Sequence, residues 1–120
     1  MKLIIAGTRT LPQKVILYIH EWWIDNNKPT ITEVVEGGAA GVDYCGYLWA
    51  KFNGIPVKEF EAEWKKHGKA AGPIRNRAMA EYADELLLIW DGKSRGSKNM
   101  KEEMEKLNKP IHEILIAMEM

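Results

Sequence analysis

Residues 34–43 read VVEGGAAGVD, and the rest of the chain is organised around this stretch. A short apolar run ends in a loop that has three glycines within five residues, Gly37, Gly38 and Gly41. Glycines let the backbone turn tightly and leave its N–H groups open to a ligand. Because the loop joins a predicted strand to the positive end of a predicted helix, it is interpreted as a phosphate-binding loop. A tight turn without any ligand is the alternative.

Length, charge and cysteine content narrow the class of protein. The 120 residues are predicted to form a single domain, residues 1–120, with a core of its own. Lysine plus arginine equals aspartate plus glutamate, at 17 each, which argues against a nucleic-acid partner held by charge. The single cysteine, Cys45, has no internal disulfide partner. Without a signal peptide or an apolar run of membrane-spanning length, a cytoplasmic protein with no membrane partner is expected.

Apolar runs predict five strands, at residues 3–6, 32–36, 55–60, 84–90 and 111–116. The first and fourth are continuous apolar runs, as in strands that are buried on both faces of a parallel sheet. Pro56 favours an edge position for the third strand, or a place at the first residue of that strand, because proline cannot donate to a neighbouring strand.

Helices are predicted between these strands. The first covers residues 11–26, with Thr10 as cap, and the second covers residues 40–53 and ends at Gly54. The third begins at residues 72–73, and the fourth is capped by Ser97 and ends at residues 109–110. A long polar loop, residues 61–71, is expected to cover a ligand, and residues 117–120 to form a loose tail. The side chains predicted to face the core are Val15, Ile19, Trp22, Val42, Trp49, Phe52, Ile74, Met79, Tyr82, Met100, Met104 and Leu107.

This alternation predicts an α/β fold, a Rossmann-like three-layer α/β/α domain with a five-stranded parallel sheet of order 3-2-1-4-5. Ligands of such folds bind at the carboxyl edge of the sheet, where the strand order reverses. The flexible loops after strands one, two and four, residues 7–9, 37–43 and 91–97, all fall on this edge. Their coincidence favours a binding site over simple turns.

Two arginines break a local rule at the start of the third helix. Arg75 and Arg77 lie in its first turns, where the helix dipole disfavours cations, and this indicates a bound anion. A salt bridge from Arg75 to Glu61 or Glu63 is the alternative.

Five motifs together resemble one family over nearly the whole chain. They lie at residues 7–9, 37–43, 71–79, 83–84 and 91–97. The resemblance is to the small YspA, cpYpsA-related domain of the SLOG superfamily, which occurs in bacterial and phage proteins. It implies a Rossmann-like fold related to the LOG and lysine-decarboxylase-like phosphoribohydrolases and to DNA-processing protein A. It also implies a nucleotide or a nucleotide-derived ligand.

Residue by residue, the resemblance implies roles and one departure. The segment 75–79 resembles the LOG arginine-lysine motif, with Asn76 in place of the lysine, so Arg75 would be the catalytic arginine of a hydrolase. The segment 92–97 resembles the LOG phosphate loop. Where LOG enzymes place a catalytic glutamate this chain has Met100, so Asp43 or Asp91 would have to replace that carboxylate.

The preferred hypothesis is a module that binds a nucleoside monophosphate or an ADP-ribose-like molecule. The alternatives are a LOG-like phosphoribohydrolase that uses Arg75 and, third, a protein associated with single-stranded DNA. The predicted ligand-binding residues are Gly7, Thr8, Arg9, Gly37, Gly38, Ala39, Gly41, Asp43, Arg75, Asn76, Asp91, Gly92, Ser94, Gly96 and Ser97.

The sequence also bears on metal ions and on contacts between copies of the chain. The histidines show no metal-ligand spacing, and only His67 is expected near a ligand. No protein-bound metal is predicted; Asp43 and Asp91 are expected to face a ribose or a magnesium ion, the one cofactor considered. The aromatic surplus of the first helix, Trp22 and Trp23 included, indicates a broad core face, and part of it is predicted to form a contact in a homo-oligomer.

Overall fold

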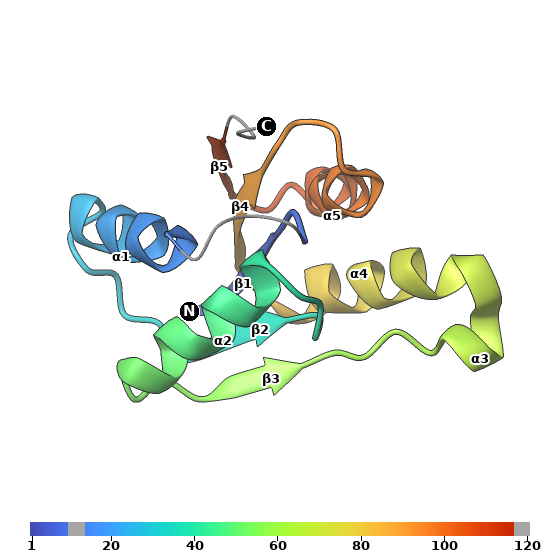
Figure 1. Ribbon diagram of the computed structural model, residues 1–120, viewed down its shortest axis with the longest axis horizontal. Coiled ribbons are helices and arrows are strands. Elements are labelled where there is room, and N and C mark those ends of the chain that lie inside the picture. Colours follow the sequence, from blue (N-terminus) through green and yellow to red (C-terminus); the bar gives the residue numbers. More distant parts are fainter. Residues whose placement is uncertain (10–13, 117–120) are drawn as a thin grey trace.

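The structure is a computed structural model, and it describes residues 1–9 and 14–116 (Figure 1). Its five strands form one parallel sheet in the order β3-β2-β1-β4-β5, as the sequence predicts. The proline-preceded strand β3 lies at an edge and β1 and β4 are central. The strands are β1 (Lys2–Gly7), β2 (Glu33–Glu36), β3 (Val57–Glu59), β4 (Glu85–Trp90) and β5 (Ile111–Leu115).

Helices connect the strands and cover both faces of the sheet. The long ones run close to their predicted positions. Thr10, the predicted cap of the first helix, and the predicted tail at residues 117–120 lie outside the described residues. The helices are α1 (Val15–Asp25), α2 (Val42–Phe52), α3 (Trp64–His67), the 3-10 helix η1 (Gly68–Ala70), α4 (Ala71–Tyr82) and α5 (Arg95–Lys106).

The alternation of side chains along each central strand divides the core in two. Leu3 and Ile5 of β1 point to the face covered by α1 and α2, where they pack with Trp49. Ile4 and Ala6 point to the opposite face, which α4 and α5 cover. The sheet is therefore buried on both faces, which explains the continuous apolar runs in its central strands.

Some predicted details are wrong. Residues 61–71 contain α3 and η1 rather than one long loop, and α4 begins at Ala71. Phe52, Ile74 and Leu107 are exposed to 82%, 46% and 43%, although their spacing predicts core positions. Phe52 ends α2, Leu107 follows α5 directly, and Ile74 lies in the first turn of α4, whose start projects past the sheet in Figure 1. Periodicity finds the inner face of a helix but not the length of helix that the sheet covers.

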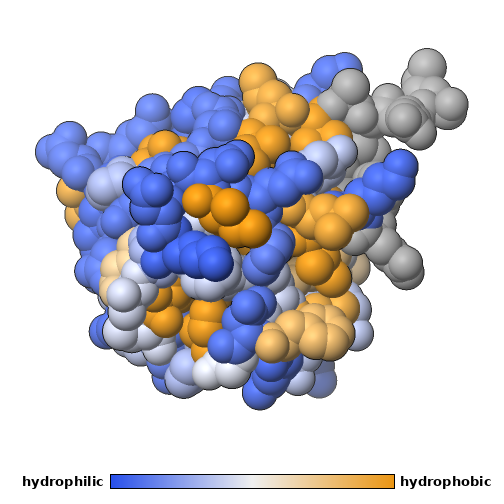
Figure 2. Space-filling view, turned by 90° about the vertical axis from the view of Figure 1, so that its left-hand side faces the viewer, coloured by the Kyte–Doolittle hydropathy of each residue, from blue (hydrophilic) through white to orange (hydrophobic). Residues whose placement is uncertain are grey.

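The aromatic side chains of α1 belong mainly to the core. The Trp23 ring lies 5.7 Å from the Trp49 ring, and the Trp22 ring lies 4.9 Å from that of His112. The predicted broad core face is thus confirmed. On the outside of α1, Leu17 and Ile24 are exposed. Figure 2, which faces the side with α1 and the C-terminal end of α2, shows apolar patches interspersed with polar side chains. A homo-oligomer stays a prediction.

Within the described residues, no helix combines the length and the apolar character needed to cross a membrane.

Candidate functional site

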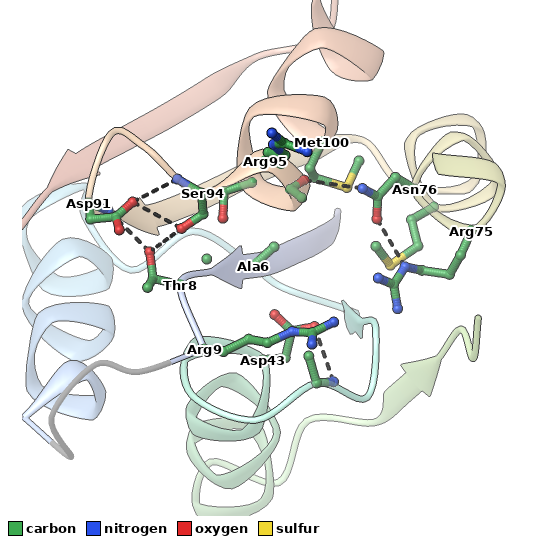
Figure 3. A pocket seen from close by; sticks show the side chains of 15 residues that line it. Ala6, Thr8, Arg9, Asp43, Arg75, Asn76, Asp91, Ser94, Arg95 and Met100 are labelled. Atoms are coloured by element: carbon green, nitrogen blue, oxygen red, sulfur yellow. Dashed lines mark hydrogen bonds between the residues drawn. The ribbon is translucent and has the colours of Figure 1, made fainter. Parts of the chain in front are cut away.

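A cavity of about 390 Å³ opens at the carboxyl edge of the sheet, between the loops that follow β1, β2 and β4 and the helices α4 and α5 (Figure 3). Its volume lies within the usual range for small-molecule sites. The three loops therefore meet at one rim, as expected. The predicted residues that line it are Gly7, Thr8, Arg9, Ala39, Asp43, Arg75, Asn76, Asp91, Ser94, Gly96 and Ser97. The other four lining residues, Ala6, Met79, Arg95 and Met100, were not among the predicted ligand-binding residues, although Met100 stands at the place of the LOG glutamate.

A second cavity of about 380 Å³ adjoins the first and shares Arg9, Ala39 and Arg75 with it. Two further predicted residues, Gly37 and Gly38, line this second cavity. Gly41 and Gly92 line neither of the two cavities, and both have positive φ, at 76° and 79°. These two glycines shape the loops, because residues with a side chain rarely adopt a backbone conformation with positive φ.

Asp91 organises the loop that follows β4. Its Oδ1 accepts hydrogen bonds from the N–H groups of Lys93 (2.8 Å) and Ser94 (2.9 Å) and from the Ser94 hydroxyl (2.9 Å). These donors, the Lys93 N–H first, lower the pKa of Asp91 to about 2. The Asp91 N–H in turn donates to the Thr8 hydroxyl at 3.1 Å, and that hydroxyl lies 3.0 Å from the Ser94 hydroxyl. The Asp91 carboxylate therefore holds its own loop together, and the Asp91 N–H joins this loop to the loop after β1.

The same loop leads directly into α5. The helix begins at Arg95, so Ser94 occupies the cap position and the prediction that Ser97 caps it is wrong. Within the described residues Ser94 makes no side-chain capping bond, and its hydroxyl donates to Asp91 Oδ1. The N–H groups of the first helical turn have no acceptor inside the helix, and the dipole makes this end positive. Arg95, Gly96 and Ser97 of this turn line the first cavity, so the positive end of the helix forms part of its wall.

The glycine-rich loop after β2 differs from its predicted role. The N–H of Gly37 donates to Asp43 Oδ2 at 3.1 Å, and the N–H of Ala39 approaches the same atom at 3.5 Å. The N–H of Gly38 donates to Glu36 Oε2 at 2.5 Å. The amides that we assigned to a phosphate thus already bind two carboxyl groups of the chain. The acidic residues on either side of the glycines were the signal in the sequence.

Burial changes the ionisation of these two carboxyl groups. Burial is the main reason why the pKa of Asp43 is raised to about 6; Arg75 and backbone N–H groups act in the opposite direction. The pKa of Glu36 is raised to about 7, chiefly by burial and also by the neighbouring carboxylates of Glu59 and Asp43, against the opposing effect of the Gly38 N–H. This loop therefore holds two carboxyl groups that titrate near neutral pH.

Arg75 faces the cavities from α4. Its Nη1 donates to the Gly37 carbonyl at 2.6 Å, and its Nε donates to Asn76 Oδ1 at 2.9 Å. The ion pairs found among the described residues do not include it, so the alternative salt bridge to Glu61 or Glu63 is wrong. Arg77, in contrast, pairs with Glu103 at 3.5 Å.

The two cavity arginines lie close enough to affect each other. Burial is the main cause that lowers the pKa of Arg75, and the charge of Arg9 lowers it further while Asp43 opposes both. Figure 3 shows the two guanidinium groups pointing toward one another. An anion between them would relieve this repulsion.

Asn76 connects α4 to α5. The residue is 4% exposed, and its Nδ2 donates to the Gly96 carbonyl at 3.2 Å and to Asn99 Oδ1 at 2.9 Å. Its oxygen accepts from Arg75. Because both amide hydrogens and the oxygen are engaged, Asn76 orients Arg75 and the first turn of α5, although it also lines the cavity.

The structure bears on the acid that a hydrolase would need. Met100, at the place of the LOG glutamate, is buried and lines the first cavity. Glu103 is also buried, but it pairs with Arg77 and Lys106 instead. Among the described residues, the carboxyl groups in the first cavity wall are those of Asp43 and Asp91.

The predicted histidine and metal features have different outcomes. His67 belongs to α3 and lines neither cavity, whereas Trp64 of the same helix lines the second. In the described part of the chain, no three or more histidine, cysteine, aspartate or glutamate side chains are grouped as a metal ion requires. A magnesium ion carried by the ligand stays a prediction.

A family model confirms the resemblance that the motifs indicate. The model of the YspA, cpYpsA-related SLOG family matches residues 1–67. The chain belongs to this family. The SLOG chain is also similar to the Gene 61 protein of Mycobacterium phage D29, with 34% identity over 85 residues, which are 65% of this chain and 67% of the phage protein.

The fold of this SLOG domain is similar to that of DNA processing protein A from Streptococcus pneumoniae, known from an X-ray structure. The TM-score is 0.77 at 18% identity, and the match covers 98% of this chain and 51% of that chain. The chain therefore spans about half the length of this neighbour, and the likeness concerns the fold. A neighbour with this name does not support the prediction, made from charge alone, that nucleic acid is an improbable partner.

Proposed function

We propose that this SLOG domain binds a nucleotide or a nucleotide-derived phosphate ligand in the first cavity. The observation that carries the proposal is the convergence of the first turn of α5 with Arg9 and Arg75 on one cavity at the carboxyl edge of the sheet. A nucleoside monophosphate and an ADP-ribose-like molecule both carry the phosphate that these groups would hold.

In this proposal the phosphate binds beside α5 rather than in the glycine-rich loop. The first-turn N–H groups and the two guanidinium groups donate to its oxygens. On the opposite wall, Asp43 would accept a hydrogen bond from a ribose hydroxyl. A phosphate against the glycine-rich loop would instead meet Asp43 and Glu36, whose carboxyl groups occupy its amides.

Thermal unfolding with AMP, ADP-ribose and ribose 5-phosphate tests the proposal. A ligand at one hundred times its dissociation constant should add about 2.7 kcal/mol to the free energy of unfolding. We expect Arg75→Ala to abolish most of this gain, because it removes a guanidinium that faces the cavity. Arg77→Ala is the matched control, since its side chain is 66% exposed and pairs with Glu103 away from the cavity.

The result would contradict the proposal if none of the three ligands raised the unfolding temperature. Equal losses in Arg75→Ala and Arg77→Ala would likewise reject the assigned phosphate position. Single-stranded oligonucleotides belong in the same screen, and affinity that falls steeply with salt would favour the DNA-associated alternative.

A phosphoribohydrolase is the second candidate, and the ionisation of Asp43 favours it. A buried carboxyl with a pKa raised to about 6, on the wall of a cavity beside an arginine, suits general acid or base catalysis. In the reaction, the bond between ribose C1′ and the base nitrogen breaks, water oxygen bonds to C1′, and a proton passes from the water to the departing base. Asp43 could relay that proton.

Release of free base from nucleoside monophosphates, followed by chromatography, separates the two candidates. Turnover that is lost in Asp43→Asn and in Arg75→Ala, but retained in Arg77→Ala, supports the hydrolase. Binding without any free base supports the binding module and rejects the hydrolase.

A further inference from the structure

The second cavity has a different chemical character from the first. It runs from the glycine-rich loop to the segment before α3, and its walls include Trp64, Glu59 and Glu61. The two cavities share Arg9 and Arg75, so a ligand held by these arginines can extend into both. The second cavity has a volume of about 380 Å³, which lies within the range for small-molecule sites.

Trp64 offers this cavity an aromatic surface. The residue is 52% exposed, although large aromatic side chains usually bury most of their area. Its ring packs on the buried start of α4, since Cη2 lies 3.4 Å from where a Cβ on Gly72 would be. The ring is thus supported by α4 while about half of the residue remains open. A supported, open indole is a suitable surface on which a planar ring can stack.

Two carboxylates give the same cavity a defined polarity. Glu59 and Glu61 line this cavity together with the two shared arginines, whose charge is opposite to theirs. Both glutamates are exposed. Glu59 approaches the glycine-rich loop so closely that a Cβ on Gly38 would lie 2.8 Å from its Oε1. Carboxylates accept hydrogen bonds and do not donate when ionised. They therefore favour a group that carries N–H donors over one that presents only oxygens.

We propose that the second cavity is a base subsite that selects nucleotides with an exocyclic amino group. The base stacks on Trp64 and donates its amino hydrogens to Glu59 or Glu61, while the phosphate lies by Arg9, Arg75 and the first turn of α5. Adenine and cytosine satisfy this arrangement. Hypoxanthine and uracil present a carbonyl oxygen at the corresponding position and meet the carboxylates unfavourably. This inference rests on the proposed phosphate-binding function and adds the class of base.

Calorimetric titration with five ligands tests it. AMP and CMP are expected to bind about tenfold more tightly than IMP and UMP, since an unpaired polar group at a recognition site has a cost on that order. Ribose 5-phosphate, which has no base, reports the phosphate site alone. In Trp64→Ala we expect the AMP affinity to fall about tenfold, as for loss of one base stack, and the ribose 5-phosphate affinity to stay unchanged.

Matched variants separate stacking from a folding defect. Trp64→Phe should recover most of the AMP affinity, because phenylalanine retains an aromatic face. Phe52→Ala removes a ring that is 82% exposed at the end of α2 and lines neither cavity, so it should bind like the unmodified protein. In the double variant Glu59→Gln, Glu61→Gln, the preference for AMP over IMP should shrink, because amides can donate to an oxygen. Glu105→Gln, an exposed change on α5, should leave it intact.

The outcomes distinguish this inference from the function beneath it. If AMP, IMP and ribose 5-phosphate bind equally, the base subsite is rejected while phosphate binding stands. If Trp64→Ala weakens ribose 5-phosphate as much as AMP, the effect is structural and stacking is rejected. If none of the five ligands binds, the subsite is rejected, and if ADP-ribose fails as well, the proposed function is overturned with it.

Discussion

The loop after β2 and the loop after β4 occupy equivalent positions between a strand and a helix but differ in their electrostatic arrangement. Both contain glycine, both leave a central region of the sheet and both lead into a helix. In the first, the N–H groups of Gly37 and Gly38 donate to the buried carboxyl groups of Asp43 and Glu36. In the second, Asp91 accepts a hydrogen bond from the Ser94 N–H, which precedes α5, and the positive end of α5 lines the first cavity.

This difference shows that glycine content alone does not make a phosphate-binding loop. The glycines allow the turn, but the acceptor that reaches the amides first decides what else can bind there. A carboxyl group six residues on in the sequence, Asp43, fills the site beside Gly37. The following predictions test whether the first loop is a structural unit and the second a binding unit.

The largest expected effect comes from Gly41→Ala in the β2 loop. Gly41 has φ of 76°, and an added Cβ would lie 2.4 Å from the Thr8 carbonyl oxygen. Positive φ and the clash together should cost about 3 kcal/mol of the free energy of unfolding. Urea denaturation measures it. Gly54→Ala is the control, because Gly54 has φ of 66° with nothing within 4 Å, and it should cost only about 1 kcal/mol. Equal losses would show that the loop does not depend on this contact.

The next largest effect is the pH dependence of the free energy of unfolding that Glu36, in the same loop, should cause. The pKa of Glu36 is raised from 4.5 to about 7 in the folded chain, so the native state binds more protons than the unfolded state in this interval. Its contribution to stability is therefore full below pH 4.5 and is lost as the pH rises through 7.

The variant Glu36→Gln should flatten this decline by an amount on the order of 2 kcal/mol, because glutamine can still accept from the Gly38 N–H but does not titrate. Asp43, with a pKa raised to about 6, contributes a decline of the same sign that remains in the variant. Urea midpoints between pH 4 and 8 measure both, with Glu105→Gln as the control. A slope that Glu36→Gln does not change would reject the assignment.

A smaller effect of opposite sign is expected from the β4 loop. The pKa of Asp91 is lowered from 3.8 to about 2, so its contribution to stability is present above pH 4 and is lost as the pH falls through 2. Asp91→Asn should therefore lower the unfolding temperature at pH 6 and lose this effect progressively in more acid solution. If the deficit instead grew on acidification, the ionised carboxylate would not be what holds the loop.

The smallest change in stability is expected from Gly96→Ala at the start of α5. An added Cβ meets nothing within 4 Å, and alanine is favoured over glycine in a helix by at most about 1 kcal/mol. The fold should be unaffected or slightly stabilised. The affinity for ribose 5-phosphate should nevertheless fall, because the added methyl group lies on the helix turn that we propose to hold the phosphate. Lys98→Ala, an exposed change in the same helix, should not affect it. Unchanged affinity in Gly96→Ala would move the phosphate elsewhere.

Local patterns were sufficient for the architecture. The continuous apolar runs of β1 and β4, the proline before β3 and the alternation of strands with helices predicted the sheet order correctly. They also placed Thr8, Asp43 and Asp91 at one rim, because parallel strands carry their following loops on the same edge. These features are readable because periodicity and topology depend on short stretches and on simple chain connections.

The assignment of partners needed the folded chain. Arg75 and Arg77 are alike in the sequence, yet one faces the cavity and the other pairs with Glu103. The occupied amides at Gly37 and the place of Trp64 in the wall of the second cavity were equally hidden. Which acceptor reaches an N–H, or which side chain borders a cavity, depends on directions and distances between elements that are remote in sequence. Only their packing sets these.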